Sequence, residues 1–230
     1  MKVINKITEN KSSVLVIAPH PDDEVLGCGG TIARFVNEEN EVHIIIVTKG
    51  TEDLFPQSLI EEGRNEAKKA SEYLGVKNLH FLDGFPAAKV DTIPSYKLNN
   101  KIFEIIQEIK PEILFIPNRK DIHKDHQLVH EAALVASRPN SNKYQPIQIM
   151  AYETLSETEW SFVPFIPNVF IDISEHLDTK INAMKFYKSQ LKQFPHTRSI
   201  ESIKNLAMFR GGVINVKYAE AFMLIRHVLL

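Results

Sequence analysis

The sequence predicts an α/β fold, Rossmann-like, with a mostly parallel sheet flanked by helices on both faces. Short apolar runs rich in β-branched residues alternate with longer amphipathic stretches, which is the pattern of repeated βαβ units. Some runs, such as residues 44–47, are apolar at every position, as is typical of strands covered on both faces. No linker, repeat or low-complexity tract interrupts the alternation, so residues 1–230 are predicted to form a single domain.

The apolar runs predict strands at residues 14–18, 42–47, 79–82, 113–116, 147–152, 169–173 and 220–225. The amphipathic stretches predict helices at about 31–37, 58–74, 95–109, 126–136, 175–190 and 200–210. Helix stop signals agree with two of these ends, because Gly75 follows the second helix and Pro111 follows the third. The aromatic segment 160–167 is predicted to be a loop that packs at an edge, contacts another subunit or covers a substrate.

Composition limits the classes of partner. The formal net charge of -2 gives no overall attraction to nucleic acid or to an anionic membrane, so neither is expected as a partner. The single cysteine, Cys28, excludes an internal disulfide. No apolar run is long enough to span a bilayer and the first residues show no signal-peptide pattern, so we expect a cytoplasmic protein.

One short segment concentrates potential metal ligands. Directly after the first predicted strand come His20, Asp22, Asp23 and Glu24, within the sequence Pro-His-Pro-Asp-Asp-Glu. An imidazole and three carboxylates between a strand and a helix are more than an ordinary connection requires. The segment is therefore interpreted as half of a metal site.

A glycine-rich stretch follows and allows a competing interpretation. Gly27, Gly29 and Gly30 lie between the first strand and the first helix, as in a dinucleotide-binding unit. However, the full G-x-G-x-x-G spacing is absent, and the preceding carboxylates would repel a phosphate. The glycines are instead assigned to close packing of strand on helix, and to a turn that aims the preceding side chains.

The second half of the site is expected after the fourth strand, where His123, Asp125 and His126 form the pattern H-x-D-H. The carboxyl ends of parallel strands share one edge of a sheet, so the two clusters can converge there. Catalytic zinc usually takes three protein ligands of this kind. An alternative pair, His126 with His130, lacks the glutamate of H-E-x-x-H, and His130 is interpreted as an ordinary helix residue.

These motifs resemble those of the PIG-L/LmbE-like zinc-dependent N-acetylglucosaminyl deacetylases, which include enzymes of mycothiol and bacillithiol biosynthesis. The likeness extends to Pro195-His196 and to the segment 218–222. The resemblance implies a Zn²⁺ ion, or another divalent metal, held by His20, Asp23 and His126. It further implies that Asp22 is the general base, that His123 steadies the oxyanion, and that Asp125 orients and charges His123.

The resemblance also implies residues that bind substrate. Arg64 aligns with an arginine that contacts the sugar, and Asp83 with an aspartate that binds sugar hydroxyls. In addition, residues 180–210 carry seven basic side chains and only one acidic side chain. His196 and Arg198 in this segment are expected near the site, where they would meet a carboxylate or phosphate on the substrate.

The expected activity is therefore zinc-dependent removal of the N-acetyl group from an N-acetylglucosamine conjugate. Three alternatives stay open: an amidase acting on another acylated amino sugar or conjugate, a non-catalytic protein that binds metal or sugar, and a nucleotide-dependent Rossmann enzyme. The expected partner is a small amino-sugar substrate, and a homo-oligomer is compatible with the aromatic loop. One residue departs from the family pattern, because Asp121 stands where mycothiol-pathway members carry a tyrosine.

Overall fold

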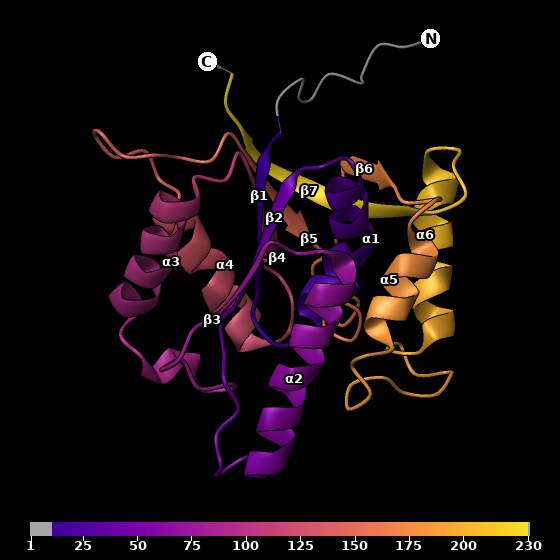
Figure 1. Ribbon diagram of the computed structural model, residues 1–230, viewed down its shortest axis with the longest axis horizontal. Coiled ribbons are helices and arrows are strands. Elements are labelled where there is room, and N and C mark those ends of the chain that lie inside the picture. Colours follow the sequence, from indigo (N-terminus) through magenta and orange to yellow (C-terminus); the bar gives the residue numbers. More distant parts are fainter. Residues whose placement is uncertain (1–10, 230) are drawn as a thin grey trace.

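A computed structural model describes residues 11–229; residue 230 and residues 1–10, inspected above for a signal peptide, lie outside the described part. One sheet with strand order β3-β2-β1-β4-β5-β7-β6 forms its centre (Figure 1). The strands are β1 (Ser13–Ala18), β2 (Glu41–Ile46), β3 (Asn78–Phe81), β4 (Ile113–Pro117), β5 (Gln148–Tyr152), β6 (Val169–Asp172) and β7 (Ala219–His227). The neighbouring strands β3, β2, β1, β4 and β5 pair in parallel, whereas β7 is antiparallel to both of its neighbours, β5 and β6. The expectation of a mostly parallel sheet is confirmed.

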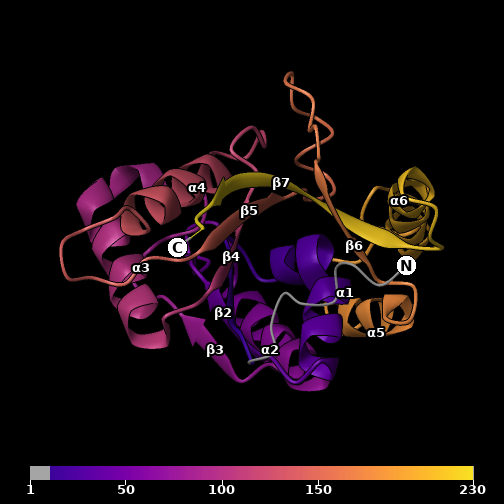
Figure 2. The same cartoon turned by 90° about the horizontal axis from the view of Figure 1, so that it is seen from above.

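Helices cover both faces of this sheet (Figures 1 and 2). One face carries α3 (Ser95–Ile109) and α4 (Lys124–Ala136). The other face carries α1 (Asp23–Asn37), α2 (Gln57–Leu74), α5 (Leu177–Met184) and α6 (Ile200–Val213). A short 3-10 helix, η1 (Val90–Thr92), precedes α3. Among the described residues, no helix combines the length and apolar character that crossing a membrane requires.

The two sides of the core follow the alternation of side chains along β1. Val14 and Val16 face the layer that contains α1, and Leu15 and Ile17 face the layer that contains α3 and α4. All four side chains are buried, as the uniformly apolar runs predicted. Burying both faces leaves the polar loops at the strand ends as the natural place for a site.

Helix α1 begins eight residues earlier than the sequence predicted, so the proposed glycine turn is wrong. Gly27 and Gly30 lie inside the helix, where the tertiary fold leaves no room for side chains. A Cβ atom on Gly27 would lie 2.2 Å from the Tyr152 ring, and one on Gly30 would lie 2.6 Å from Ile173. Glycine is less favourable than alanine inside a helix, but here it allows α1 to pack closely against its neighbours.

The predicted helix 175–190 is also wrong at its end, because α5 stops at Met184. The backbone N–H groups of Phe186 and Tyr187 bond three residues back, to Ala183 and Met184. These tight turns direct Tyr187 into the interior, where its hydroxyl donates a hydrogen bond to Glu24. The buried contact between Tyr187 and Glu24 therefore outweighs the amphipathic pattern of residues 175–190, which favoured a longer helix.

Candidate active site

The two ligand-rich segments meet at the carboxyl edge of the sheet, after β1 and after β4. The first segment begins two residues past the end of β1 and continues into the first turn of α1. In the second segment, His123 is the N-cap of α4, and its Nδ1 accepts the backbone N–H of Asp125. His126 lies in the first turn of the same helix. The parallel topology thus brings together residues that are about a hundred positions apart in sequence.

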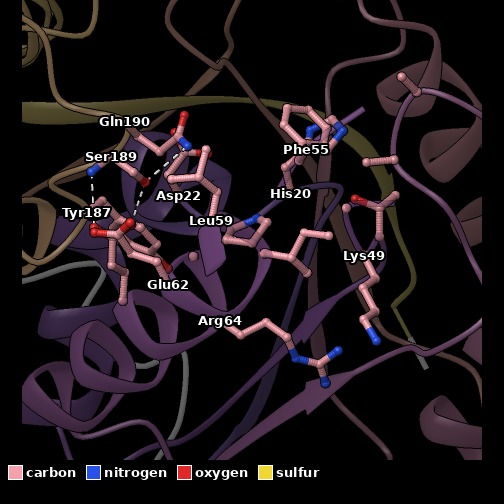
Figure 3. Close-up of a pocket in the computed structure, with 18 of the residues that line it drawn as sticks. His20, Asp22, Lys49, Phe55, Leu59, Glu62, Arg64, Tyr187, Ser189 and Gln190 are labelled. Carbon is pink, nitrogen blue, oxygen red and sulfur yellow. Dashed lines mark hydrogen bonds between the residues drawn. The ribbon is translucent and has the colours of Figure 1, made fainter. Parts of the chain in front are cut away.

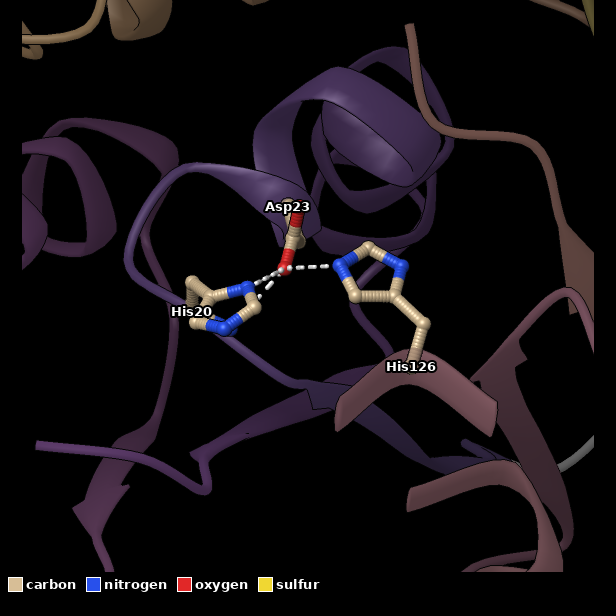
Figure 4. A group of neighbouring side chains, drawn as sticks. All are labelled: His20, Asp23 and His126. Atoms are coloured by element: carbon tan, nitrogen blue, oxygen red, sulfur yellow. Dashed lines mark hydrogen bonds and ion pairs between the residues drawn. The ribbon is translucent and has the colours of Figure 1, made fainter. Parts of the chain in front are cut away.

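Three of these side chains form a group able to hold a metal ion (Figure 4). His20 Nδ1 and His126 Nε2 each lie 3.2 Å from Asp23 Oδ2. The other carboxylate oxygen, Asp23 Oδ1, is buried and has no hydrogen-bond partner. A buried acceptor without a donor is costly unless something else binds there. Two imidazoles with one carboxylate are a donor set that suits a catalytic zinc.

The carboxylates around His20 and His126 favour positive charge at this group. Burial lowers the pKa of His20, but its hydrogen bonds to Asp125 and Asp23 outweigh burial and raise that pKa to about 9. Burial opposes protonation of His126 too, yet the charge of Asp23 and a hydrogen bond to Asp121 raise its pKa to about 10. The carboxylates thus favour positive charge on both rings, and a divalent cation would supply that charge.

Asp121 is a member of the site that sequence reasoning did not identify. Its Oδ2 atom lies 2.9 Å from His126 Nδ1, and its Oδ1 atom accepts hydrogen bonds from Asn118 and Thr158. The residue is fully buried. A carboxylate on the far nitrogen of a metal-binding histidine fixes its tautomer and orientation. The available signal was an acidic residue two positions before H-x-D-H.

Asp22 stands beside the metal group with a strained backbone, since its φ of 111° lies in the left-handed region. The side chain is buried, and Arg198 Nη1 lies 3.1 Å from its Oδ2 atom. Burial and the neighbouring Asp23 carboxylate raise the pKa of Asp22 well above its ordinary value, and Arg198 opposes that rise. Asp22 lies outside the His20, Asp23 and His126 group and lines the cavity beside it.

Arg198 reaches this position from the irregular segment between α5 and α6. Besides contacting Asp22, its guanidinium donates to Ser156, Gln190 and Glu157. These contacts use most of its donors, and the side chain is largely buried. The guanidinium therefore lies at the site, as the sequence suggested, but its partners are protein groups. His196, in contrast, is exposed and accepts the backbone N–H of Arg198 at Nδ1.

The structure arranges His123 and Asp125 differently from the expected charge pair. Asp125 Oδ2 lies 3.1 Å from His20 Nε2 and accepts the backbone N–H of Ala88, but it is 4.0 Å from His123 Nδ1. Burial and the positive charges of His20 and His126 lower the pKa of His123 to about 4. His123 is thus held neutral, and Asp125 orients His20 rather than His123.

A cavity of about 600 Å³ opens in front of these groups. His20, Asp22, His123 and Arg64 are among the residues that line it, and Figure 3 shows Arg64 apart from Asp22. Arg64 Nη1 pairs with Asp83 Oδ1 at 2.8 Å, and its guanidinium points away from Asp22. Asp83 and His196, both proposed to bind substrate, are not among the residues that line this cavity.

His130 is not part of the metal group. It is buried and its Nδ1 donates a hydrogen bond of 2.8 Å to the backbone carbonyl of Pro117. This bond ties α4 to the end of β4, which is the helix-packing role that the sequence suggested. The alternative pair of His126 with His130 is therefore not formed.

The fold and this site define a class: an α/β protein with a His/Asp group able to hold a metal ion beside a buried carboxylate. The profile of the family described as "PIG-L: GlcNAc-PI de-N-acetylase" matches residues 15–137, and the chain belongs to this family. The chain is 26% identical to diacetylchitobiose deacetylase of Thermococcus kodakarensis, over 99% of this chain and 88% of that protein. It is 30% identical to the probable N-acetyl-alpha-D-glucosaminyl L-malate deacetylase 2 of Bacillus cereus, over 77% and 83%.

A solved structure extends the comparison to three dimensions. The N,N'-diacetylchitobiose deacetylase from Pyrococcus horikoshii, complexed with an inhibitor, superimposes with a TM-score of 0.77 at 25% identity. The match covers 94% of this chain and 85% of that one. Both the sheet and the flanking helices of this chain therefore follow the fold of the deacetylases.

Proposed function

We propose that this protein is a zinc-dependent hydrolase that removes the N-acetyl group from an N-acetylglucosamine-type substrate, releasing acetate and the free amine. Two relatives, which match 99% and 77% of this chain, are named deacetylases. The observation that carries the proposal is the position of Asp22, which lines the cavity and directly precedes a ligand of the proposed metal group. A carboxylate in that position suits the activation of water.

His20, Asp23 and His126 are the residues that would hold the zinc ion. When bound, zinc supplies a Lewis acid that makes water a better nucleophile and polarises the acetamide carbonyl. Asp22 accepts the proton of the attacking water. Arg198 Nη1 donates a hydrogen bond to Asp22 Oδ2, which leaves Oδ1 without a contact to that guanidinium. The proton held by Asp22 is then available to the departing amine.

His123 is the candidate donor to the developing oxyanion. Its ring lies 4.5 Å from the ring of His20, centre to centre, and it is partly exposed to the cavity. Because Nδ1 accepts the N–H of Asp125, the neutral ring carries its proton on Nε2. A fixed N–H donor of this kind stabilises negative charge without itself being charged.

The deciding experiment combines metal analysis with product detection. Purified protein with one equivalent of zinc is incubated with N-acetylglucosamine, diacetylchitobiose, N-acetylglucosaminyl malate and nucleotide-linked N-acetylglucosamine, and acetate and amine are measured. We expect zinc-dependent release of both in equal amounts. Bound zinc without release from any substrate would favour a non-catalytic binding protein. Release only from other acylated amines would favour the amidase alternative.

The remaining expectations concern the protein's setting. A cytoplasmic location is proposed from its single cysteine, which is buried in the core and forms no disulfide within the described chain. A nucleotide cofactor in the glycine segment is disfavoured, because Tyr152 and Ile173 fill the space beside Gly27 and Gly30. The choice of zinc over another divalent metal rests on the two imidazoles in the donor set.

A further inference from the structure

One wall of the cavity is formed by apolar side chains. Phe55, Leu59 and Ile60 lie along it, and the side chains of Phe55 and Leu59 are 43% and 47% exposed. In Figure 3 Phe55 and Leu59 lie between Lys49 on one side and the group of Tyr187, Ser189 and Gln190 on the other. Partly exposed apolar side chains that line a pocket are a common means of holding the uncharged part of a ligand.

The loop that carries Phe55 is held by several contacts. The backbone N–H groups of Leu54 and Phe55 both bond to the carbonyl of Thr51. The Asp53 carboxylate pairs with Lys89. The phenyl ring also lies next to Gly50, where an added Cβ would be 3.4 Å from Phe55 Cδ2. The wall is therefore preorganised, which reduces the entropy lost on binding.

The lining of the cavity carries both signs of charge. Four cationic side chains line it, namely Lys49, Arg64, Lys188 and Arg198. Four carboxylates also line it, namely Asp22, Glu62, Glu66 and Glu157. Arg198 is engaged by protein groups and Arg64 by Asp83, so neither guanidinium is free for a carboxylate or phosphate. The earlier expectation that Arg198 meets an anionic part of the substrate loses its support.

We propose that the apolar wall is a subsite for an uncharged group attached to the amino sugar, and that Phe55 and Leu59 select for it. The group presents an apolar face, which an aryl or alkyl aglycone or the face of a second sugar ring can provide. Aromatic side chains bind such faces with little loss of side-chain entropy. This inference rests on the proposed deacetylation, because that reaction places the acetamide group at Asp22 and the rest of the substrate outward.

The test compares zinc-loaded wild type, Phe55→Ala, Leu59→Ala and the control Leu54→Ala. Leu54 is equally exposed on the same loop but does not line the cavity. The substrates are N-acetylglucosamine, its phenyl glycoside, diacetylchitobiose and N-acetylglucosamine 1-phosphate. In the wild type we expect kcat/KM for the phenyl glycoside or diacetylchitobiose to exceed that for the 1-phosphate by at least about tenfold, which is the factor that 1.4 kcal/mol supplies.

The variants decide whether the wall causes this preference. Phe55→Ala should lower the ratio of phenyl glycoside to N-acetylglucosamine kcat/KM toward one, mainly through KM, whereas Leu54→Ala should leave the ratio unchanged. Loss of the diacetylchitobiose advantage instead would identify a second sugar ring as the natural occupant. An unchanged ratio in Phe55→Ala and Leu59→Ala, or a preference for the 1-phosphate, would overturn the subsite.

Failure of the proposed reaction would be recognised separately. If no substrate releases acetate, the proposed function is wrong, and the subsite is then tested by calorimetric binding of phenyl glucosaminide to the zinc-loaded protein. Tighter binding of this compound than of glucosamine, lost in Phe55→Ala, would support the subsite. Equal binding of the two compounds would overturn it.

Discussion

Asp22 combines a strained backbone with a buried carboxylate, and both properties follow from its place at the start of α1. Its backbone N–H bonds to Glu24 Oε2, and its backbone carbonyl receives the N–H groups of Val25 and Leu26. Its side chain lines the cavity and is not part of the metal group. Non-glycine residues keep left-handed conformations where the surroundings enforce them, often at catalytic sites.

Replacing Asp22 with asparagine should separate metal binding from turnover. Asparagine tolerates the left-handed conformation, but its amide cannot accept a proton. We expect Asp22→Asn to keep one zinc per chain and to lose turnover by about 10²–10⁴-fold. Zinc content and acetate release are measured together, with exposed Asp178→Asn as the control. Full activity in Asp22→Asn would show that another group is the base.

Asp121→Asn should weaken zinc binding without removing a ligand. The carboxylate of Asp121 lies on the far nitrogen of His126 and makes that ring more basic. Losing such a partner typically reduces metal affinity by about 10–100-fold. Competition with a chelator of known affinity measures the change. An unchanged dissociation constant would mean that Asp121 serves packing alone.

At the scale of elements, α1 is the helix on which the site depends. Its first turn carries Asp23, and its middle is fixed by a buried ion pair from two other elements. Glu220 of β7 accepts the backbone N–H groups of Gly30 and Thr31, while Lys180 of α5 donates to Glu220 and to the carbonyl of Leu26. The segment 218–222, recognised in the sequence without a role, thus anchors this helix.

Gly27→Ala should destabilise the protein because Tyr152 cannot move aside. The Tyr152 ring is fully buried and its hydroxyl donates to the carbonyl of Ile17 in β1. Forcing a methyl group into such contact costs about 1–3 kcal/mol of unfolding free energy, and more when the neighbours are rigid. Urea unfolding measures the loss. Gly212→Ala in α6 is the matched control, since its added Cβ meets no atom within 4 Å.

At the scale of the whole molecule, the metal group ties α1 to α4 across the sheet. Zinc binding is therefore expected to raise the free energy of unfolding. Without metal, protons on His20 and His126 take over part of that role. Their folded-state pKa values of about 9 and about 10 exceed the ordinary value of 6.5. Protonation thus stabilises the folded protein, fully below pH 6.5, and this contribution is lost as pH rises through 9 to 10.

The metal-free protein should accordingly lose thermal stability between pH 6.5 and 9.5, while zinc affinity increases over the same range because fewer protons must be displaced. Scanning fluorimetry of chelator-treated protein across this range measures the first trend, and zinc titration the second. His126→Ala should weaken both trends. A metal-free melting temperature that rises with pH in wild type, relative to His126→Ala, would contradict the assigned charges.

The aromatic loop, residues 160–167, bears on how the whole molecule contacts substrate or other copies of itself. Trp160 and Phe162 are 70% and 103% exposed, and no residue of 160–167 lines the cavity in front of Asp22. The hypothesis of a substrate lid therefore gains no support in this conformation. A contact between copies of the chain stays a prediction, which light scattering on wild type and a Phe162→Ser variant can test.

Much of the fold was predictable because its signals are local. Apolar runs and helix stop signals placed the strands and most of the helices within a few residues, and the two ligand-rich motifs marked the carboxyl edge. The start of α1 was missed because three glycines favour a turn locally. The reason for glycine in this helix is visible only in the structure, where Tyr152 packs against Gly27 and Ile173 against Gly30.

The sequence by itself determined the family, the fold class and the identity of the candidate metal ligands, since these depend on residue types at fixed spacing. Tertiary structure decided which partner each side chain has. In the folded protein Asp125 contacts His20, Arg198 donates to Asp22, and Asp121 contacts Nδ1 of His126. The first two pairings join segments far apart in the sequence, and all three depend on hydrogen-bond distances of a few tenths of an ångström that no residue pattern encodes.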